Sequence, residues 1–431
     1  MKRCERLRYN ADAPRRWEQQ FTPFVSEFGV FQMETDQSGA ASLAYLVHDL
    51  DDAAVRRRVD LLAGEGFVVG LGGFRRNAEG VTGPGGALRK SVSGQTALGH
   101  GVLDLGRTMD ARLGQRLVAV AKRMLSPGAM RDLCGSAPVI VARNLEMLAL
   151  AWRIRLPRQR LVYECLDIHR LMLGTGRKSR VMRWIERRLL ARTDLVIVSS
   201  PAFARDYFAT RQGRRERVLL VENKVPVERR AVSAAERPIG DGAVWTIGWF
   251  GMLRCRKTLE QLGGLAASSG GRIKVVIAGI ASPAEFPDFP AQVAAFPGLS
   301  YSGPFRQDDL ASLYGMVDFV WAIDYFEEGL NSDWLLPNRL YEGLANGVPP
   351  IALKGVETGR WLQRHGVGLL VDDPVAELPD LLADLMVFGD GRMREAIANL
   401  PEHALYQTSA ERREIVAAIT GQARSGELSC G

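Results

Sequence analysis

The sequence has no apolar run that approaches the roughly 18 residues needed for a membrane-spanning helix. Its opening stretch, MKRCERLRYNADAPRRWEQQ, lacks the apolar core of a secretion signal. Cysteine is scarce, and no two Cys residues have CxxC spacing, nor does any Cys have CxxH spacing. This pattern argues against a disulfide framework and against a structural zinc site. The five residues are Cys4, Cys134, Cys165, Cys255 and Cys430. These absences predict a chain that folds in the cytoplasm with reduced thiols.

Common nucleotide-binding motifs are also absent. Neither GLGGFR nor GPGGAL fits the G-x-G-x-x-G pattern of dinucleotide-binding folds, and the chain has no GxxxxGK[ST] phosphate loop. No DxD-like pair of carboxylates suggests a metal site. We therefore expect no NAD chemistry, no bound cofactor and no metal ion.

Lysine is rare: only eight of the 56 basic residues are Lys. The chain has 49 acidic residues. The formal net charge is +7, but Arg is concentrated between Arg153 and Arg217, which makes the charge a local surface property. We expect no nucleic-acid partner from this bias. The 46% of hydrophobic residues is an ordinary globular value, and 431 residues at roughly 150 per domain suggest two or three domains.

A regular alternation of strand-like and helix-like segments fills most of the chain. After an N-terminal extension at 1–43 with no clear period, residues 44–224 alternate short apolar runs with helical stretches. Residues 225–243 are polar, carry Pro and Gly, and are typical of an interdomain linker. The alternation restarts in 244–400. Residues 401–431 predict a C-terminal helix and tail that pack back on the first domain.

Such alternation with apolar strands is typical of parallel sheets covered on both faces. The predicted fold class is α/β, with two doubly wound Rossmann-like domains that face a cleft. Ligands of such folds bind at the carboxyl ends of the strands, so polar residues that directly follow strands are the candidates for a site.

The segment GWFGMLRCRKTLEQL places a Gly turn at Gly251 and three basic residues directly before a predicted helix. Basic side chains at a helix N-terminus oppose the helix dipole, and a bound anion relieves that conflict. Arg254, Arg256 and Lys257 therefore predict a site for an anionic group such as a diphosphate. The alternative is a basic helix start without a ligand.

The segment PNRLYEGLANG gives a second candidate. Pro337 suits a helix start, and Arg339 and Glu342 follow at a spacing of one turn, so both side chains lie near one helix face. A carboxylate suits the two hydroxyls of a ribose, and a guanidinium suits phosphate oxygens. An ordinary salt bridge between the two residues is the alternative.

The order of these segments, with SGPF between them, resembles the GT-B glycosyltransferases of the large GT4-like group, especially bacterial exopolysaccharide enzymes of the succinoglycan type. The resemblance covers roughly 44–400 and is most specific in 245–372. It implies a GT-B fold and a retaining transfer of a hexose from a nucleotide sugar to a lipid-linked or polysaccharide acceptor. Such an enzyme acts in the synthesis of cell-surface glycans.

The resemblance also assigns roles to donor-binding residues. It implies that Lys257, with Arg254 or Arg256, holds the diphosphate, and that Glu342 holds the ribose. Asn338 and Arg339 belong to the same donor-binding helix start.

Two departures from the family pattern stand out. Trp334 occupies the place of the first Glu of E-x7-E, which touches the donor sugar in the family, and Met252 occupies the place of a common Arg. Asn331, Asp333 and Glu328 are the candidates to replace the missing carboxylate.

Two His residues follow strands of the first domain. YECLDIHRL ends a predicted strand with Asp167 and His169, which resembles the D-x-H element where the His meets the donor sugar, so both are catalytic candidates. His48 ends the strand of YLVHDL and is a candidate to bind the acceptor. For each His the alternative is a structural role at a strand end.

Residues 176–194, GRKSRVMRWIERRLLARTD, form a basic amphipathic segment. Such a helix suits an anionic membrane surface, which predicts a peripheral enzyme on the inner membrane face. The alternative is a surface helix that packs its apolar stripe on the sheet.

Two other classes of function stay open at this point. A nucleotide-sugar 2-epimerase shares the two-domain architecture and needs no acceptor. A non-catalytic GT-B-like binding protein is also consistent with the missing Glu.

Overall fold

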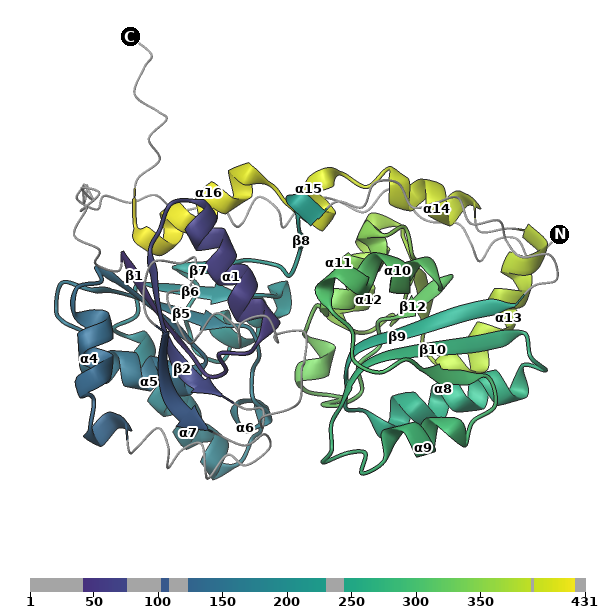
Figure 1. Ribbon diagram of the computed structural model, residues 1–431, viewed down its shortest axis with the longest axis horizontal. Coiled ribbons are helices and arrows are strands. Elements are labelled where there is room, and N and C mark those ends of the chain that lie inside the picture. Colours follow the sequence, from purple (N-terminus) through teal and green to yellow (C-terminus); the bar gives the residue numbers. More distant parts are fainter. Residues whose placement is uncertain (1–41, 76–101, 108–122, 230–243, 389–390, 423–431) are drawn as a thin grey trace, which may run out of the picture.

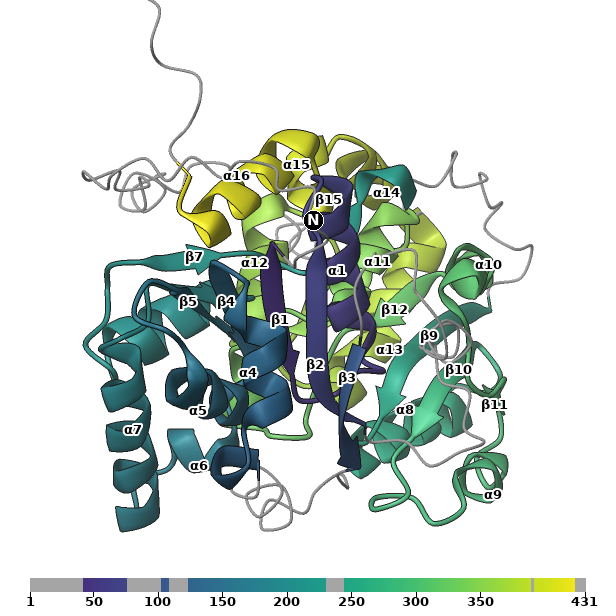
Figure 2. The same ribbon diagram turned by 60° about the vertical axis from the view of Figure 1, so that its left-hand side comes forward.

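The computed structural model describes residues 42–75, 102–107, 123–229, 244–388 and 391–422. All but the last two residues of the predicted N-terminal extension, and most of the predicted linker, lie outside these residues, and Leu43 of the predicted extension belongs to the first strand. Two α/β domains stand side by side, and the C-terminal helices run across the top of both (Figures 1 and 2).

The first domain is built on a seven-stranded sheet in which every neighbouring pair is parallel, in the order β3-β2-β1-β4-β5-β6-β7. Its strands are β1 (Leu43–Val47), β2 (Val69–Arg75), β3 (Val102–Arg107), β4 (Val139–Arg143), β5 (Arg160–Cys165), β6 (Leu195–Val198) and β7 (Val218–Leu220). Its helices are α1 (Ala53–Gly64), α4 (Gly128–Gly135), α5 (Leu145–Ile154), α6 (Arg170–Leu173), α7 (Arg177–Leu190) and the π-helical segment η3 (Phe203–Ala209).

The second domain has a six-stranded parallel sheet in the order β11-β10-β9-β12-β13-β14. Its strands are β9 (Trp245–Leu253), β10 (Ile273–Ala281), β11 (Leu299–Tyr301), β12 (Phe319–Trp321), β13 (Pro350–Leu353) and β14 (Leu369–Val371). Its longer helices are α8 (Arg256–Ser268), α9 (Phe289–Ala294), α10 (Leu310–Gly315), α11 (Asn338–Ala345), α12 (Glu357–His365) and α13 (Pro374–Phe388), and short 3-10 turns follow β11 and β12 at η5 (Gln307–Asp309) and η6 (Asn331–Asp333). The predicted fold of two doubly wound domains is confirmed.

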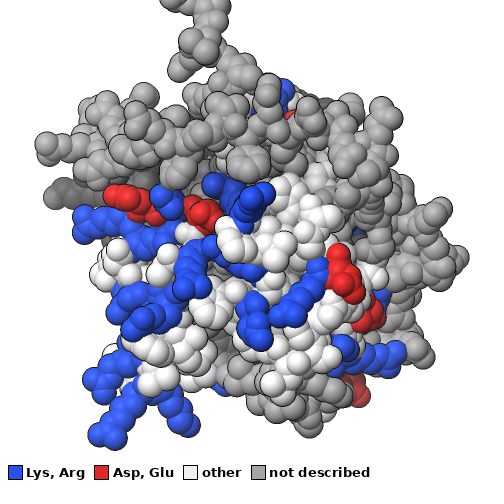
Figure 3. Space-filling view, turned by 90° about the vertical axis from the view of Figure 1, so that its left-hand side faces the viewer, with Lys and Arg blue, Asp and Glu red and all other residues white. Residues whose placement is uncertain are grey.

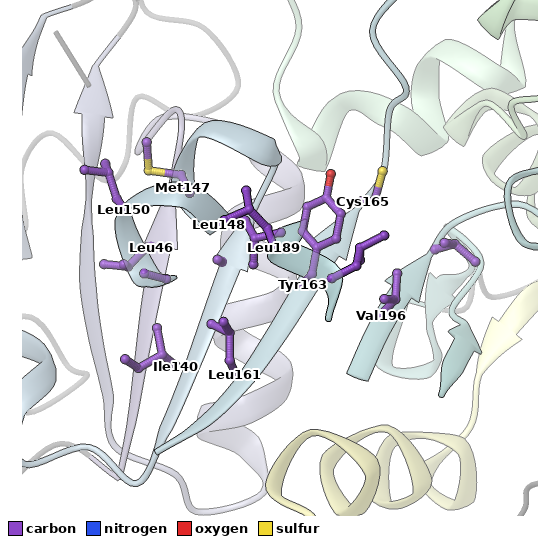
Figure 4. Close-up of a cluster of buried hydrophobic side chains, with 14 of the residues drawn as sticks. Leu46, Ile140, Met147, Leu148, Leu150, Leu161, Tyr163, Cys165, Leu189 and Val196 are labelled. Atoms are coloured by element: carbon purple, nitrogen blue, oxygen red, sulfur yellow. The ribbon is translucent and has the colours of Figure 1, made fainter. Parts of the chain in front are cut away.

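Both faces of each sheet are buried, which explains why the strands are apolar without alternation. All five residues of β1 are buried, and successive side chains enter different cores. Leu46 faces the core under α4, α5 and α7, where it meets Ile140, Leu148 and Leu161 (Figure 4). Tyr45 faces the opposite core under α1. Burial of each large apolar side chain stabilises the fold by roughly 1.5–3 kcal/mol.

The chain returns to the first domain at its C-terminal end. The helices α14 (Gly391–Ala398) and α15 (Glu402–Leu405) lead to β15 (Tyr406–Gln407). This short strand pairs with β8 (Val225–Pro226), and β8 is followed by the 3-10 turn η4 (Val227–Arg229). The last helix, α16 (Ser409–Thr420), covers the same face of the first sheet as α1. Ile415, Val416 and Ile419 join this core, and Arg160 Nε donates to the Ile419 carbonyl at 2.9 Å. The first domain therefore depends on residues from the end of the described chain.

No helix among the described residues combines the length and the apolar character needed to cross a membrane.

The helix α7 is anchored by one buried carboxylate. Glu186 is 2% exposed and accepts hydrogen bonds from Tyr163, Tyr207 and Gln212, which lie on β5, in η3 and just after η3. Burial raises the pKa of Glu186 to about 7, although these hydrogen bonds and the charge of Arg183 act in the opposite direction. A single titratable group thus links α7 to the sheet.

We predict that Glu186 makes stability depend on pH. Its folded pKa of about 7 lies above its unfolded value of 4.5, so its contribution is full below pH 4.5 and is lost as the pH rises through 7. The loss amounts to about 3 kcal/mol, at 1.36 kcal/mol per pKa unit. Glu186→Gln, which stays neutral, should reduce the fall in the urea unfolding midpoint between pH 5 and pH 8.5. Glu260→Gln, on an exposed face of α8, should keep the wild-type fall. An identical fall in all three proteins would contradict the prediction.

Candidate functional site

Residues that follow strands of both sheets meet in one cleft. Asp167 comes directly after β5 of the first domain, and Asn331 lies in the loop after β12 of the second. The Asn331 amide donates to the Asp167 carboxylate, and its Oδ1 accepts from the backbone N–H of Ile168 at 3.3 Å. The carboxyl edges of the two sheets therefore face each other, as doubly wound folds with a ligand cleft require.

The N-terminus of α8 provides an anion-binding arrangement. Its N-cap residue, Cys255, makes no side-chain capping hydrogen bond, so the first N–H groups are not occupied by a cap. Thr258 Oγ1, in the first turn, is buried and has no hydrogen-bond partner among the described residues. Lys257 stands beside this helix end, with Nζ at 2.7 Å from Glu328 and 4.1 Å from the Tyr325 ring centre. Positive charge and uncapped N–H groups thus converge here.

Arg254 completes the basic group on the second domain. Its guanidinium lies 3.8 Å from the Asp324 carboxylate and stacks over the Phe326 ring at 4.5 Å. It also acts on the first domain. Desolvation raises the pKa of Asp167 above its ordinary value, and the charge of Arg254 opposes that shift, although Asp167 keeps exposed surface.

Gly251 and Arg256 are placed differently from the sequence-based expectation. Gly251 lies inside β9, which continues to Leu253, so the predicted Gly turn at this position is wrong. Its φ of 114° and the open space at its missing Cβ still leave the backbone accessible. Arg256 points along α9, where it donates to the Glu285 carbonyl at 2.6 Å and to Gln292 at 3.2 Å, apart from Arg254 and Lys257.

The helix α11 brings Arg339 and Glu342 to the cleft, and Asn338 is exposed at its first position. Arg339 donates to the Ile323 carbonyl at 3.2 Å, and its Nε is buried without a partner among the described residues. Burial lowers the pKa of Arg339, and the nearby Asp324 opposes that shift. An anion near this guanidinium would therefore relieve an unfavourable burial of charge.

Glu342 is held from two sides. The Tyr314 hydroxyl lies 3.4 Å from one oxygen, and Arg57 of the first domain lies 3.7 Å from the other. Burial raises the pKa of Glu342, and Arg57 is the largest opposing influence. Glu342 therefore pairs with Arg57 across the domains, and the alternative of an Arg339–Glu342 salt bridge is not what the structure shows.

Two predicted residues of the first domain lie at strand ends on this side. His169 is the N-cap of α6, where its Nδ1 accepts from the Leu171 N–H at 3.2 Å and its ring is exposed. His48 is half-buried after β1 and lies close enough to Asp52 to affect its ionisation. Burial disfavours ionisation of Asp52, but Arg143 and His48 outweigh it and hold the pKa of Asp52 below its ordinary value.

The residue in place of the first family Glu has a structural contact. Trp334 packs with Leu330 and Leu335 against the core of the first domain, and the Arg211 guanidinium lies 5.1 Å from its ring. Its carbonyl accepts a hydrogen bond from the Ser200 hydroxyl. Among the candidates to replace the Glu, Asn331 binds Asp167, Asp333 accepts from the Gly329 N–H at 3.1 Å, and Glu328 pairs with Lys257.

A buried charge network supports the first-domain side and was not predicted from the sequence. Glu164, with no exposed surface, accepts from Arg58 at 2.8 Å and from the Tyr45 hydroxyl, and Arg143 lies 3.5 Å away. Arg143 extends the network to Asp52 at 3.0 Å, next to His48. The position of Arg143 at the end of β4 was the available signal.

A cavity of about 360 Å³ lies between α1 and the segment that follows β7. Both signs of charge line it, with Arg57, Arg58 and Arg229 facing Asp60 and Glu228. Arg254, Lys257 and Arg339 do not line it, so it is separate from the basic residues of the second domain.

The part of the chain that the structure describes contains no group of three or more His, Cys, Asp or Glu residues arranged to hold a metal ion.

We predict that Asn331→Asp weakens the contact between the domains. The new carboxylate would face Asp167 at hydrogen-bond distance, and it would replace a donor by a like charge in a buried position. A lost buried hydrogen bond to a charged group costs about 1.5–3 kcal/mol. Differential scanning fluorimetry should show a lower unfolding temperature for this variant. Asn399→Asp adds the same charge at an exposed position and should leave it unchanged. Equal effects would show that net charge alone is responsible.

Comparison with known proteins agrees with this geometry. The glycosyl transferase 4-like domain model matches residues 82–224. Succinoglycan biosynthesis protein ExoL of Rhizobium meliloti is 43% identical over 342 residues, which cover 77% of this chain and 81% of ExoL.

Solved glycosyltransferase structures share the fold at low sequence identity. Anabaena HepE in complex with UDP and glucose aligns with a TM-score of 0.64 and 16% identity, over 88% of this chain and 100% of HepE. Sucrose-phosphate synthase from Thermosynechococcus elongatus aligns with a TM-score of 0.63 and 15% identity, over 86% of this chain and 96% of the synthase. The chain therefore belongs to the GT4-like glycosyltransferases of exopolysaccharide synthesis, and its two doubly wound domains form the GT-B fold.

Proposed function

We propose that this glycosyltransferase moves a hexosyl residue from a nucleoside diphosphate sugar to a lipid-linked or polysaccharide acceptor, with retention of configuration and without a metal ion. The observation that carries the proposal is the convergence of Arg254, Lys257 and Arg339 at the uncapped N-terminus of α8, with Glu342 one turn beyond Arg339. A diphosphate and a ribose diol require this combination of charges.

The proposed donor site is complete without a metal ion. Three side-chain cations and the N–H groups of α8 can stabilise the charge that develops on the diphosphate as the bond to the sugar breaks. Lys257 and Arg254 are balanced by Glu328 and Asp324 at 2.7 and 3.8 Å. A diphosphate must therefore compete with these carboxylates for Lys257 and Arg254. The free energy of donor binding is the difference between the cation–diphosphate contacts that form and the cation–carboxylate contacts that are lost.

Asp167 and His169 face this group from the first domain and lie where the sugar would project from the diphosphate. His169 is exposed, and its Nδ1 accepts from the Leu171 N–H, so in the neutral ring the proton lies on Nε2. In the proposed transfer the bond between the sugar and the diphosphate breaks, the acceptor oxygen forms the new glycosidic bond on the same face, and the hydroxyl proton passes to the departing diphosphate oxygen. We assign His48, directly after β1, to the acceptor side.

A direct assay tests the proposal. The protein is incubated with a panel of nucleotide sugars, with and without a membrane-lipid extract, in the presence of EDTA, and the products are analysed by mass spectrometry. We expect a hexose added to a lipid-linked or polysaccharide species, with loss of activity only when donor or extract is omitted. An epimerised sugar from donor alone would support the 2-epimerase alternative. Binding without any turnover would support a non-catalytic protein.

We predict that Glu342→Ala weakens binding of nucleosides and nucleoside diphosphates by the same factor. Each hydrogen bond from a ribose hydroxyl to a carboxylate is worth about 1.5–3 kcal/mol at most, so a loss of tenfold or more is expected. Lys257→Ala should instead weaken UDP or GDP without changing uridine or guanosine. Calorimetric titration of both variants separates the two roles. An unchanged dissociation constant for every ligand in Glu342→Ala would reject the ribose assignment.

The same proposal includes a membrane surface. On α7, residues such as Ser179 and Glu186 face the core, whereas Val181, Trp184 and Ile185 are 56%, 54% and 37% exposed. This arrangement differs from a helix that packs its whole apolar stripe on the sheet. The neighbouring end of α5 exposes Trp152 and Leu156. We call these five apolar residues, with the basic residues around them, the α5–α7 surface.

Basic side chains surround the apolar part of the α5–α7 surface. Figure 3 shows this side of the first domain, where basic groups dominate and uncharged surface lies between them. Arg188 stacks over Trp184 at 5.1 Å, and Arg192 stacks over Trp152 at 5.2 Å. Aromatic side chains flanked by cations suit the headgroup region of an anionic bilayer. By contrast, Arg183 and Arg187 donate to backbone carbonyls and hold the helix in place.

We predict that the protein sediments with vesicles containing anionic lipid at low salt, less with neutral vesicles, and is released at high salt. Each exposed basic residue contributes about 1 kcal/mol near such a surface. Changing Arg177, Lys178 and Arg180 to Gln should abolish the anionic preference, and Trp184→Ala should weaken binding to both kinds of vesicle. Changing the distant exposed residues Lys274, Arg392 and Arg413 to Gln provides the charge-matched control. Equal binding to neutral and anionic vesicles would reject the electrostatic part.

A further inference from the structure

The carboxylate proposed to hold the ribose is already occupied from the opposite domain. Arg57 lies on α1, which stands beside α11 of the second domain (Figure 2). Its guanidinium approaches Glu342 to 3.7 Å, and the two side chains are only 18% and 16% exposed. A ribose diol and Arg57 therefore require the same group.

Each carboxylate oxygen of Glu342 already has a polar neighbour that a ribose hydroxyl would have to displace or share. Tyr314 lies at Oε2 of Glu342, and Arg57 lies at Oε1. The separation of 3.7 Å exceeds the 2.7–3.2 Å of ordinary N–H···O hydrogen bonds, so the pair is held by charge more than by directed hydrogen bonds. Such a contact is easier to exchange than a bidentate ion pair.

The charge of Arg57 is only partly stabilised in this position. Burial lowers its pKa, the positive charges of Arg143 and Arg229 act in the same direction, and Glu342 and Asp52 oppose them. Arg57 also lines the cavity of about 360 Å³ beside α1, where Asp60 and Glu228 offer other carboxylates. The side chain has both the room and the partners to leave Glu342 when a ligand takes its place.

We propose that Arg57 is a cross-domain competitor for the donor site: it neutralises Glu342 in the empty cleft, and the ribose of the donor displaces it. The inference rests on the proposed ribose role of Glu342. Donor binding then removes an ionic contact between α1 and α11, and return of Arg57 after transfer favours departure of the nucleoside diphosphate. Arg57 thereby sets the affinity for donor and product and links both to the contact between the domains.

The test compares nucleoside binding in matched variants. Uridine and guanosine are used because they carry the ribose without the diphosphate, and UDP and GDP are measured in parallel by calorimetric titration. Arg57→Gln and Arg57→Ala should tighten nucleoside binding by about fivefold, the effect of losing one modest ion pair. Arg57→Lys should stay near wild type. Arg56→Ala removes a positive charge from the same turn of α1 and is the control.

Two further measurements separate this role from a structural one. In the Glu342→Ala background, Arg57→Ala should have no additional effect on nucleoside affinity, because the competition no longer exists. In steady-state assays Arg57→Ala should lower KM for the donor and lower kcat when product release limits turnover, a combination that a damaged fold does not give. Circular dichroism melts check that each variant is folded.

The outcomes are distinct. Weaker or unchanged nucleoside binding in folded Arg57→Gln and Arg57→Ala, together with weaker binding in Glu342→Ala, would overturn the competitor role and leave the ribose site intact. Unchanged nucleoside binding in Glu342→Ala itself would reject the ribose site, and the competitor role with it. If Arg56→Ala tightened nucleoside binding as much as Arg57→Ala, the effect would come from the loss of any positive charge on α1 and not from the contact with Glu342.

Discussion

The docking of the segment 330–336 into the first domain determines the geometry of the cleft. Asn331 binds Asp167 and the backbone of Ile168, and Trp334 lies between the first-domain core and Arg211. These contacts place the carboxyl edges of two separately folded sheets at hydrogen-bond distance. The charge of Arg254 acts on the Asp167 carboxylate because this docking brings the two residues together. Trp334, at the position where the resemblance implies a carboxylate, instead makes a contact that holds the domains together.

Charge balance is the second constraint on the cleft. Each cation that faces it has a nearby anion: Lys257 has Glu328, and Arg57 has Glu342. Partly buried cations without such partners would destabilise the empty protein, because burial disfavours an unpaired charge. The same pairing lowers the affinity for any anionic ligand, which must break existing ion pairs to bind. The cleft therefore balances the stability of these ion pairs against affinity for an anionic ligand.

The sequence predicts the sheets better than the cleft. Runs such as PVIVAR and KVVIAG are β-branched and apolar, and their burial on both faces makes that pattern unambiguous. The basic residues before α8 were also visible, because they stand at a fixed place after a strand. The direction of each side chain could not be predicted from the sequence. Arg256 and Lys257 are adjacent, yet Arg256 points along α9 and Lys257 points toward Glu328. Tertiary partners, and not local pattern, decide between them.

Arg57 shows why such cross-domain contacts escape a reading of the sequence. In VRRRVDLL the three arginines look like the solvated face of an amphipathic helix, and nothing distinguishes the second from its neighbours. In the folded chain Arg58 enters the buried network of Glu164, Arg57 crosses to Glu342, and Arg56 takes part in neither of these contacts. Successive residues of a helix point about 100° apart, so three identical side chains reach a buried network, a facing domain and a third direction. The role of Arg57 depends on its contact with Glu342 of the second domain, so it cannot be inferred from the sequence of α1 alone.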